Sequence, residues 1–255
     1  MSRIWLVRHG QAGTRKAYDA LSDLGRKQAR LLGEYFAGQG IQWTAAYSGE
    51  LTRQQQTAQE VREAAQSGGA TFPDIQIEPR WNEFDLDEVY RSLAPQLAAA
   101  DPEFHREYEE LRAQARAAAD DQNAAVHRRW LPSDVKIISA WVSGSHPYEG
   151  ETWEAFCGRV LSIAPAAQRG IAPAAQRGID PAAERDSDIV VFTSATPIGV
   201  WTARTMDITD ERAMKLAGAL HNASYTVIKL NGAESRLHTF NATPHLATAE
   251  LRTWR

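Results

Sequence analysis

One histidine stands where a short apolar run gives way to polar residues. The run 4–7 is followed at once by Arg8, His9 and Gly10. An imidazole is a competent nucleophile toward phosphoryl groups, and a guanidinium offers a planar set of N–H donors that matches phosphate oxygens. Glycine lets the backbone approach a ligand closely. This cluster therefore indicates a phosphate site.

Two further polar segments directly follow apolar runs. Residues 48–53 follow the run 43–47, and Thr193-Ser194-Ala195-Thr196 follow the run 189–192. Ligands of an open parallel sheet bind at the carboxyl ends of its strands. We interpret all three runs as strands, so we expect these polar segments to meet Arg8 and His9 at one edge of a sheet.

The last of these segments also opens a helix. Thr196 is the expected N-cap, and Pro197 is the expected first residue of a helix that runs to about Met206. The N–H groups and the dipole at a helix N-terminus favour a bound anion. We therefore expect this helix to point its N-terminus at a phosphate.

The elements that hold these residues follow from hydrophobic periodicity and capping signals. Strands are expected at residues 4–7, 43–47, 75–77 and 189–192, with helices from Ser22 to Gly38, at about 51–65, from near Glu151 and at 211–220. Alternation of strand and helix predicts parallel pairing with right-handed crossovers. The runs 225–230 and 236–240 are expected to pair antiparallel through Asn231-Gly232. The sequence thus predicts an α/β fold with a mostly parallel sheet.

Two segments depart from this alternation within what we interpret as a single domain, 1–255. Residues 86–150 are rich in Ala, Arg, Glu and Trp, and we expect a helical cap inserted over the active site. Residues 163–185 repeat Ile-Ala-Pro-Ala-Ala-Gln-Arg-Gly with a period of eight. Proline in every unit excludes one continuous helix, and the units are too short and too few for a solenoid. We interpret the repeat as a duplication that lengthens a surface connection; a partner-binding role is the alternative.

Composition limits the function classes. The 255 residues carry a net charge of −4, so no strong basic field favours nucleic acid or an anionic membrane. No apolar stretch reaches the 18 residues of a membrane span. The single cysteine, Cys157, excludes an intrachain disulfide and a site of several thiolates. The N-terminal residues are too polar for a signal peptide, so we expect a cytoplasmic protein. The sequence does not predict its oligomeric state.

Three other classes that handle phosphate lack their motifs in this chain. There is no Gly-x4-Gly-Lys-Ser/Thr run of a P-loop NTPase. The glycine-rich turn of a dinucleotide-binding fold does not follow the first apolar run. We find no clustered Asp and His ligands of a metal phosphatase and predict no metal.

The segment Leu6-Val7-Arg8-His9-Gly10-Gln11 resembles the signature of the histidine phosphatase superfamily, which includes phosphoglycerate mutases and acid phosphatases. Further segments agree with that family in the same order. They are residues 21–29, residues 47–58 around Arg53, Trp81-Asn82-Glu83-Phe84-Asp85, Gly150-Glu151-Thr152-Trp153 with Arg159-Val160, residues 220–224 and residues 240–246. The resemblance covers most of the chain except the insertion and the repeat. It implies a three-layer α/β/α sandwich of the phosphoglycerate mutase type.

The resemblance also implies roles for four residues. His9 attacks phosphorus and becomes phosphohistidine, while Arg8 and Arg53 hold the phosphoryl oxygens. Glu83 protonates the leaving oxygen and then activates water. No metal or cofactor is implied, and the expected ligand is a small phosphorylated substrate or inorganic phosphate.

Other residues are candidates for the same site. The acidic residues that compete with Glu83 are Asp85, Asp87 and Glu88, the first-loop residues that could touch substrate are Thr14 and Arg15, and the insertion residues that could line the pocket are His127, Arg128, Arg129, Trp130 and Trp141. The tryptophans are explained equally well by packing.

One position departs from the family. The family has a second histidine after the late strand, and Ser194 stands there in this chain. Loss of one such donor commonly costs about 10²–10³ in rate. Ser194 and the N–H groups around Ala195 are the predicted phosphate donors, with His146 or His221 as candidates to replace the missing imidazole.

The sequence therefore predicts a metal-independent phosphomonoester hydrolase that acts through a phosphohistidine on a small metabolite. A pseudophosphatase that binds a phosphorylated ligand with weak or no catalysis is one alternative. A phosphoglycerate-mutase-type phosphotransferase is another, and we favour hydrolysis because the insertion does not resemble a mutase lid. The residues do not identify the substrate.

Overall fold

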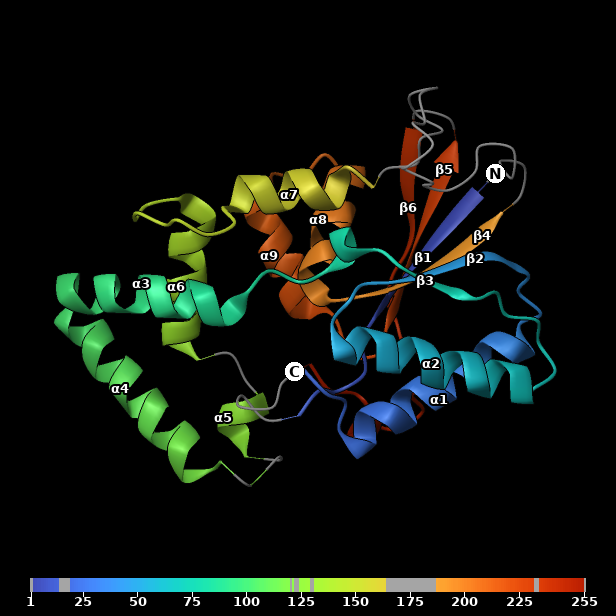
Figure 1. The fold of residues 1–255 in the computed structure, drawn as a ribbon, viewed down its shortest axis with the longest axis horizontal. Coiled ribbons are helices and arrows are strands. Elements are labelled where there is room, and N and C mark those ends of the chain that lie inside the picture. The colour runs from blue at the N-terminus through green and yellow to red at the C-terminus, as the bar shows by residue number, and fades with distance from the viewer. Residues whose placement is uncertain are drawn as a thin grey trace.

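The computed structural model describes residues 2–13, 19–119, 121, 124–128, 131–163, 187–231 and 234–254. A six-stranded sheet runs through its centre in the order β3-β2-β4-β1-β5-β6 (Figure 1). The strands are β1 (Ser2–Arg8), β2 (Trp43–Ser48), β3 (Ile75–Ile77), β4 (Asp188–Thr193), β5 (Tyr225–Asn231) and β6 (Glu234–Ala242). The pairs β1–β4, β2–β4 and β2–β3 are parallel, whereas β1–β5 and β5–β6 are antiparallel. The predicted mostly parallel sheet and the antiparallel final pair are confirmed.

Strand order in the sheet does not follow the order of the strands along the chain. The late strand β4 lies between β1 and β2, with Val191 opposite both Leu6 and Tyr47. All six residues of β4 are buried, so this strand is covered on both faces and suits the centre of the sheet. Alternation of strand and helix predicts the direction of pairing but does not predict which strands are neighbours.

Helices cover both faces of the sheet. Helices α1 (Asp23–Gly38) and α2 (Thr52–Ser67) pack on one face, and α7 (Trp153–Leu161), α8 (Ala195–Thr205) and α9 (Asp210–Ala219) lie on the other (Figure 1). Alternate residues of β4 divide between the two cores, because Val190 and Phe192 pack with α1 and α2 while Val191 packs with α8. The predicted three-layer α/β/α sandwich is confirmed.

Capping residues set where two helices begin. The predicted N-cap Ser22 accepts a hydrogen bond from Gly25 N at 3.1 Å. The prediction for α8 was wrong by two residues, because its N-cap is Ser194 and not Thr196. Pro197 is therefore the third residue of the helix. The first residues of a helix have no intrahelical acceptor for their N–H groups, so proline fits either position and does not fix the register.

The segment between β3 and α7 forms a lobe of helices beside the sandwich. A 3₁₀ turn at Pro79–Trp81 leads into α3 (Leu86–Ala100), α4 (Pro102–Ala117), α5 (Ala125–Arg128) and α6 (Pro132–Ser143). This lobe occupies most of the range 86–150 predicted as an inserted cap. Except for Ile163, the repeat at 163–185 lies outside the described residues, as does Gly232 of the predicted hairpin turn.

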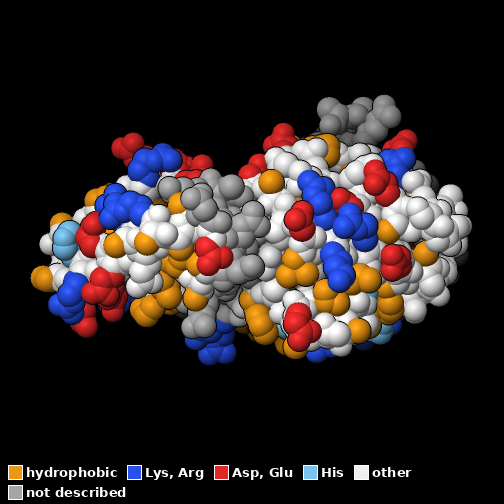
Figure 2. Space-filling model, turned by 90° about the horizontal axis from the view of Figure 1, so that it is seen from below, with side chains coloured by type: hydrophobic (Ala, Val, Ile, Leu, Met, Phe, Trp, Pro, Cys, Tyr) orange, Lys and Arg blue, Asp and Glu red, His pale blue; other side chains and the backbone are white. Residues whose placement is uncertain are grey.

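A narrower waist separates the helical lobe from the sandwich in the view from below (Figure 2). On that face, Lys and Arg side chains are interspersed with Asp and Glu, and neither sign forms a continuous field (Figure 2). In the part of the chain that the structure describes, no helix has the length and apolar character needed to cross a membrane.

Candidate active site

The backbone around His9 is fixed by the elements on both sides of β1. His9 N donates to Thr193 O at 2.9 Å, at the end of β4. On the other side, Ala223 N donates to His9 O at 3.1 Å, just before β5. The position of β1 between β4 and β5 therefore holds His9 at the carboxyl end of the parallel strands, as the sequence predicted.

Two glycines allow the loop after His9 to pack against the start of α1. A Cβ atom on Gly10 would lie 2.4 Å from Gly25 O, and one on Gly25 would lie 2.1 Å from Gln11 O. Neither position can carry a side chain without moving backbone. The glycine next to His9 is thus required for close approach of two protein segments.

The ring of His9 has a defined orientation and charge. Its Nδ1 lies 2.7 Å from Gly10 O, and a carbonyl oxygen can only accept, so Nδ1 carries the proton. Burial lowers the pKa of His9 well below its ordinary value, and the nearby charges of Arg53 and Arg8 lower this pKa further. His9 is therefore a neutral imidazole at neutral pH with Nε2 as its unprotonated nitrogen.

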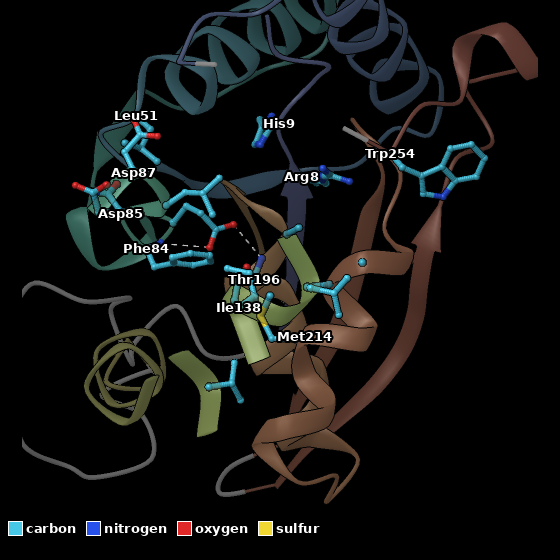
Figure 3. Close-up of a pocket in the computed structure, with 18 of the residues that line it drawn as sticks. Arg8, His9, Leu51, Phe84, Asp85, Asp87, Ile138, Thr196, Met214 and Trp254 are labelled. Carbon is cyan, nitrogen blue, oxygen red and sulfur yellow. Dashed lines mark hydrogen bonds between the residues drawn. The ribbon is translucent and has the colours of Figure 1, made fainter. Parts of the chain in front are cut away.

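Arg8 and Arg53 reach the same cavity as His9. All three line a hollow of about 1180 Å³ between the sandwich and the helical lobe (Figure 3). Arg8 is 4% exposed and donates to the carbonyl of Leu220. Arg53, on the first turn of α2, is 7% exposed and forms an ion pair with Asp19 at 3.2 Å. Two guanidinium groups are thus held beside one imidazole, an arrangement that suits a phosphoryl group.

Glu83 lies across the cavity at the N-terminus of α8. Its Oε2 accepts from Thr196 N at 3.2 Å (Figure 3). Burial raises the pKa of Glu83, because it disfavours the charged carboxylate. The hydrogen bonds from Thr196 and the charge of Arg53 oppose this shift only in part. The N–H of Thr196 that we expected to face a phosphate is therefore bound to Glu83.

The three competing carboxylates are placed differently. Asp85 is the N-cap of α3 and accepts from Glu88 N at 2.9 Å. Asp85 and Asp87 also line the cavity, whereas Glu88 is not among the described residues that do. For Asp85 a structural role is evident, and burial raises the pKa of Glu83, so Glu83 is the best candidate for an acid.

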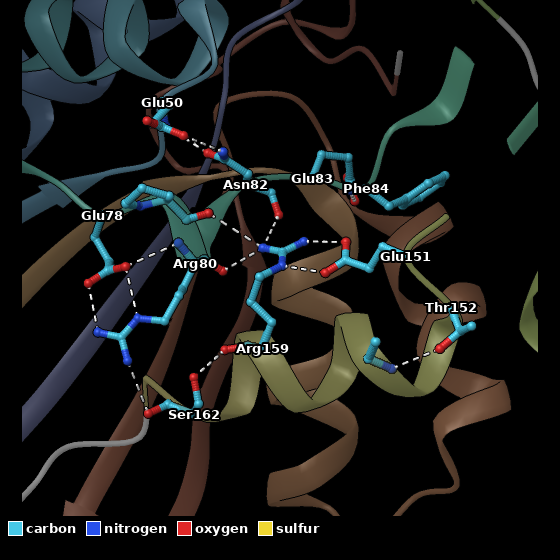
Figure 4. A network of polar contacts seen from close by, with 12 residues as sticks. Glu50, Glu78, Arg80, Asn82, Glu83, Phe84, Glu151, Thr152, Arg159 and Ser162 are labelled. Carbon is cyan, nitrogen blue, oxygen red and sulfur yellow. Dashed lines mark hydrogen bonds and ion pairs between the residues drawn. The ribbon is translucent and has the colours of Figure 1, made fainter. Parts of the chain in front are cut away.

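A network of hydrogen bonds fixes the loop that carries Glu83 (Figure 4). Arg159 of α7 donates to the Glu151 carboxylate at 2.6 and 2.8 Å. Its third nitrogen donates to the backbone carbonyls of Arg80 at 2.9 Å and Asn82 at 3.2 Å. Arg159 thereby ties α7 to the residues just before Glu83.

The same loop is held from the sheet side through Trp81. Its carbonyl accepts from Thr193 Oγ1 at 2.6 Å and from Gln54 Nε2 at 3.2 Å. The indole of Trp81 is 1% exposed and stacks on Trp201 with ring centroids 5.9 Å apart. The loop is therefore held by the sheet, by α2 and by α8 at once.

Ser194 lies behind the cavity wall. It is 1% exposed, and its Oγ accepts from Gln54 Nε2 at 2.9 Å. Ala195 lines the cavity, but Ser194 is not among the described residues that do. Donation from the Ser194 hydroxyl to a phosphate stays a prediction.

The other predicted residues lie elsewhere. His146 bonds Ser145 in a separate hollow beside α4 and α6, and His221 packs on Trp254 with ring centroids 4.5 Å apart. Neither histidine is among the described residues of the main cavity. Trp141 is buried against Phe84, with ring centroids 4.3 Å apart. Outside the described residues or side chains lie Thr14, Arg15, His127, Arg128, Arg129 and Trp130.

Sequence reasoning missed several residues that shape the site. Asp19 pairs with Arg53, Thr196 binds Glu83, and Trp254 lines the cavity from the C-terminal segment. Arg159 was noted only as part of a motif. A lone aspartate or a tryptophan near the end of a chain carries no local signal of a site, so only the fold reveals these contacts.

Comparison with solved structures shows a shared fold. The native structure of a mycobacterial glucosyl-3-phosphoglycerate phosphatase is 20% identical, with a TM-score of 0.54 and 94% of this chain and 99% of that chain covered. Bacillus stearothermophilus YhfR is 16% identical, with a TM-score of 0.57 and coverage of 96% and 99%. A phosphoserine phosphatase mutant from Entamoeba histolytica in complex with phosphoserine is 14% identical, with a TM-score of 0.51 and coverage of 96% and 100%.

Two further structures of the mycobacterial phosphatase are complexes with VO3 and with inorganic phosphate. No curated protein sequence matches this chain. The family model of the histidine phosphatase superfamily, branch 1, matches residues 4–139, which is more than half of the chain. This protein therefore belongs to the histidine phosphatase superfamily.

Proposed function

We propose that this protein hydrolyses phosphomonoesters through a phosphohistidine on His9, without a metal or cofactor. The observation that carries the proposal is that His9, Arg8, Arg53 and Glu83 line one cavity, where a phosphoryl group could meet a nucleophile, two cations and an acid. The pKa of His9 is lowered and that of Glu83 is raised, in both cases chiefly by burial. A neutral nucleophile and a protonated acid can therefore coexist at the same pH, as the first step requires.

In the first step, the Nε2 lone pair of His9 attacks phosphorus, and the bond from phosphorus to the ester oxygen breaks. Glu83 gives its proton to that oxygen, and the alcohol leaves. Arg8 and Arg53 hold the phosphoryl oxygens and stabilise the charge that develops on them. Positioning and electrostatics supply most of the acceleration, since a loose transition state needs little covalent help.

In the second step, the Glu83 carboxylate takes a proton from water as the water oxygen attacks phosphorus. The P–N bond breaks, its electron pair returns to Nε2, and inorganic phosphate leaves. His9 is again neutral and Glu83 is again protonated, so the cycle closes with no other reactant.

The comparisons support a phosphorylated ligand. Proteins of similar fold include phosphatases for glucosyl-3-phosphoglycerate and phosphoserine and complexes with inorganic phosphate and VO3. We therefore propose a small phosphorylated metabolite as substrate and inorganic phosphate as product, with no nucleic acid or membrane partner, and a cytoplasmic location. The helical segment 86–150 is proposed to act as a cap over the site.

One observation favours a second candidate, a phosphate-binding pseudophosphatase. No imidazole occupies the position of the family's second histidine, and the Ser194 hydroxyl that stands there accepts from Gln54. The site therefore has one strong donor fewer. We favour catalysis because His9 and Glu83 both line the cavity together with Arg8 and Arg53.

Phosphate release from 4-nitrophenyl phosphate in the presence of a chelator tests the proposal. His9→Ala should abolish turnover, whereas His105→Ala, which removes an exposed histidine of α4, should leave it unchanged. Turnover in the His9 variant equal to wild type would remove the proposed nucleophile. Absence of turnover in the wild type, together with measurable phosphate binding, would favour the pseudophosphatase.

A further inference from the structure

The cavity extends well beyond the residues that suit a phosphate. Its volume of about 1180 Å³ exceeds the usual range of ligand pockets, roughly 300–1,000 Å³. His9 and Arg8 lie on one side of it, with Trp254 of the C-terminal segment beside Arg8, and Ile138 of α6 and Met214 of α9 lie across from them (Figure 3). The wall across from His9 faces the part of a substrate that leaves as the alcohol.

The far wall is largely apolar. Helix α6 contributes Val135, Ile138 and Val142, which share one face because they are three and four residues apart. Helix α9 contributes Met214 and Ala217. These five side chains cannot hydrogen-bond a sugar or an amino acid, and they gain free energy by covering an apolar group. The same two helices also line the cavity with Ser139, Ser143 and Lys215.

Part of this apolar wall is left open. Val135 is 54% exposed and Trp254 is 53% exposed. They are two of the four large hydrophobic residues that are this exposed within the described residues, the others being Ile77 and Met206, which lie outside the cavity. Half of the strongly exposed large apolar side chains thus gather around one ligand cavity.

Trp254 is held in place rather than loosely attached. Asn222 N donates to Thr253 O at 2.7 Å, and Gln28 Nε2 donates to Leu251 O at 2.7 Å. The indole also packs against His221 in a tilted arrangement, with ring centroids 4.5 Å apart. A fixed aromatic face binds a ligand without a large cost in side-chain entropy.

Charge on the lining argues against a second anionic group in the substrate. Beyond the two arginines, Lys215 is the one cation among the described lining residues. Carboxylates are more numerous there, since Asp19, Asp85 and Asp87 join Glu83. Once the two arginines hold the phosphoryl group, Lys215 is the cation among the described lining residues that a second anionic group could pair with.

We propose that the preferred substrate is the phosphomonoester of a mainly apolar alcohol of metabolite size, whose hydrocarbon part lies against α6, α9 and Trp254. This inference rests on the proposed function for the identity of the phosphate end. The apolar wall then acts as the specificity element of the site.

A series of n-alkylphosphonates from ethyl to octyl tests the inference by binding alone. These compounds keep the phosphate-like head and cannot be hydrolysed, so calorimetry measures contact with the wall whether or not the protein is a catalyst. Affinity should rise by about 4-fold for each methylene that the wall covers. An affinity that stays flat or falls along the series would overturn the proposal.

A matched pair of variants locates the effect. Met214→Gln places an amide on the cavity wall, while Met206→Gln makes the same change at a side chain that is 48% exposed outside the cavity. Octylphosphonate affinity should fall by about 10-fold in Met214→Gln and stay at the wild-type value in Met206→Gln. Inorganic phosphate should bind all three proteins equally. Equal octylphosphonate affinity in the two variants would contradict the assigned wall.

Turnover with propyl phosphate and glycerol 3-phosphate separates this inference from the proposed function. Both esters release a primary alcohol, and they differ mainly in two hydroxyl groups. A higher kcat/KM for the propyl ester supports the apolar wall, and a preference for the glycerol ester contradicts it. If neither these esters nor 4-nitrophenyl phosphate is hydrolysed, the proposed function fails, and the phosphonate series still decides the apolar site.

Discussion

Replacing Glu83 with glutamine tests the proposed acid with little change in shape. The glutamine oxygen can still accept from Thr196 N, which lies 3.2 Å from Glu83 Oε2. The variant loses the proton that Glu83 gives to the leaving oxygen and later takes from water. A change in rate therefore reports proton transfer more than lost packing.

The size of the effect depends on the leaving group. A positioned acid contributes about 10²–10⁴ in rate, so kcat with an alkyl phosphate should fall by that factor, or about 3–5 kcal/mol of activation free energy. Nitrophenolate leaves without needing a proton. The first-turnover burst of nitrophenolate from 4-nitrophenyl phosphate should therefore fall far less, and the ratio of the two losses isolates the acid role.

The same substitution should change stability in a pH-dependent way. Burial raises the pKa of Glu83 in the folded chain, whereas the unfolded chain titrates near the ordinary value. Between these two values the folded protein keeps a proton that the unfolded chain has lost, so the wild-type free energy of unfolding falls as pH rises. Glutamine does not titrate, so the variant does not show this fall. Above the folded-state pKa of Glu83, its free energy of unfolding should exceed that of the wild type by about 1.4 kcal/mol for each unit between the folded and unfolded pKa values.

Stopped-flow bursts, steady-state kcat and denaturant unfolding at two pH values measure these effects. Asp87→Asn is the matched control, because Asp87 lines the same cavity. In this variant the rates with the alkyl phosphate and with 4-nitrophenyl phosphate should keep the ratio that they have in the wild type. Equal losses for both substrates in Glu83→Gln would refute the acid role. The acid role would also be refuted if Asp87→Asn lowered kcat with the alkyl phosphate as much as Glu83→Gln does.

Three further substitutions have defined expectations. Arg53→Ala should weaken phosphate binding in calorimetry by about 10- to 100-fold, because it removes charged hydrogen bonds, whereas Arg62→Ala on the same helix should not; equal affinity in both would count against the phosphate role. Arg159→Lys should lower kcat and shift the alkaline limb of the pH profile with KM nearly unchanged, because a lysine cannot reproduce the forked contacts to Glu151 and the loop, while Arg62→Lys, at an ion pair with Asp74, should keep the wild-type profile. Leu32→Ala, at a fully buried side chain, should lower the free energy of unfolding by about 2–5 kcal/mol; a loss below 1 kcal/mol in urea titrations would show that the core tolerates the cavity.

Local signals in the sequence were sufficient for most elements. The apolar run before Arg8 became β1, Ser22 capped α1 as expected, and residues 75–77 form β3. These predictions succeed because strand burial and helix capping depend on near neighbours. The position of β4 between β1 and β2 was not predicted, because it depends on which buried strand takes the centre of the sheet.

The site shows the same division. The residues Arg8, His9, Arg53 and Glu83 were named from the sequence, and the structure brings them to one cavity. The hydrogen bond from Thr196 to Glu83 was not foreseen, because it joins residues 113 positions apart. Long-range contacts of this kind leave no pattern in the local sequence.

Direct detection of phosphohistidine tests the central claim most sharply. The protein is mixed with substrate in the presence of a chelator, and the reaction is quenched in alkali. The protein is then digested, and the phosphorylated peptide is sequenced by mass spectrometry. The account predicts an acid-labile phosphoryl group on His9 that is absent in His9→Ala and accumulates more in Glu83→Gln with 4-nitrophenyl phosphate, since water activation is impaired. A protein that turns over while His9 stays unmodified, or that carries the phosphoryl group on another residue, would contradict it.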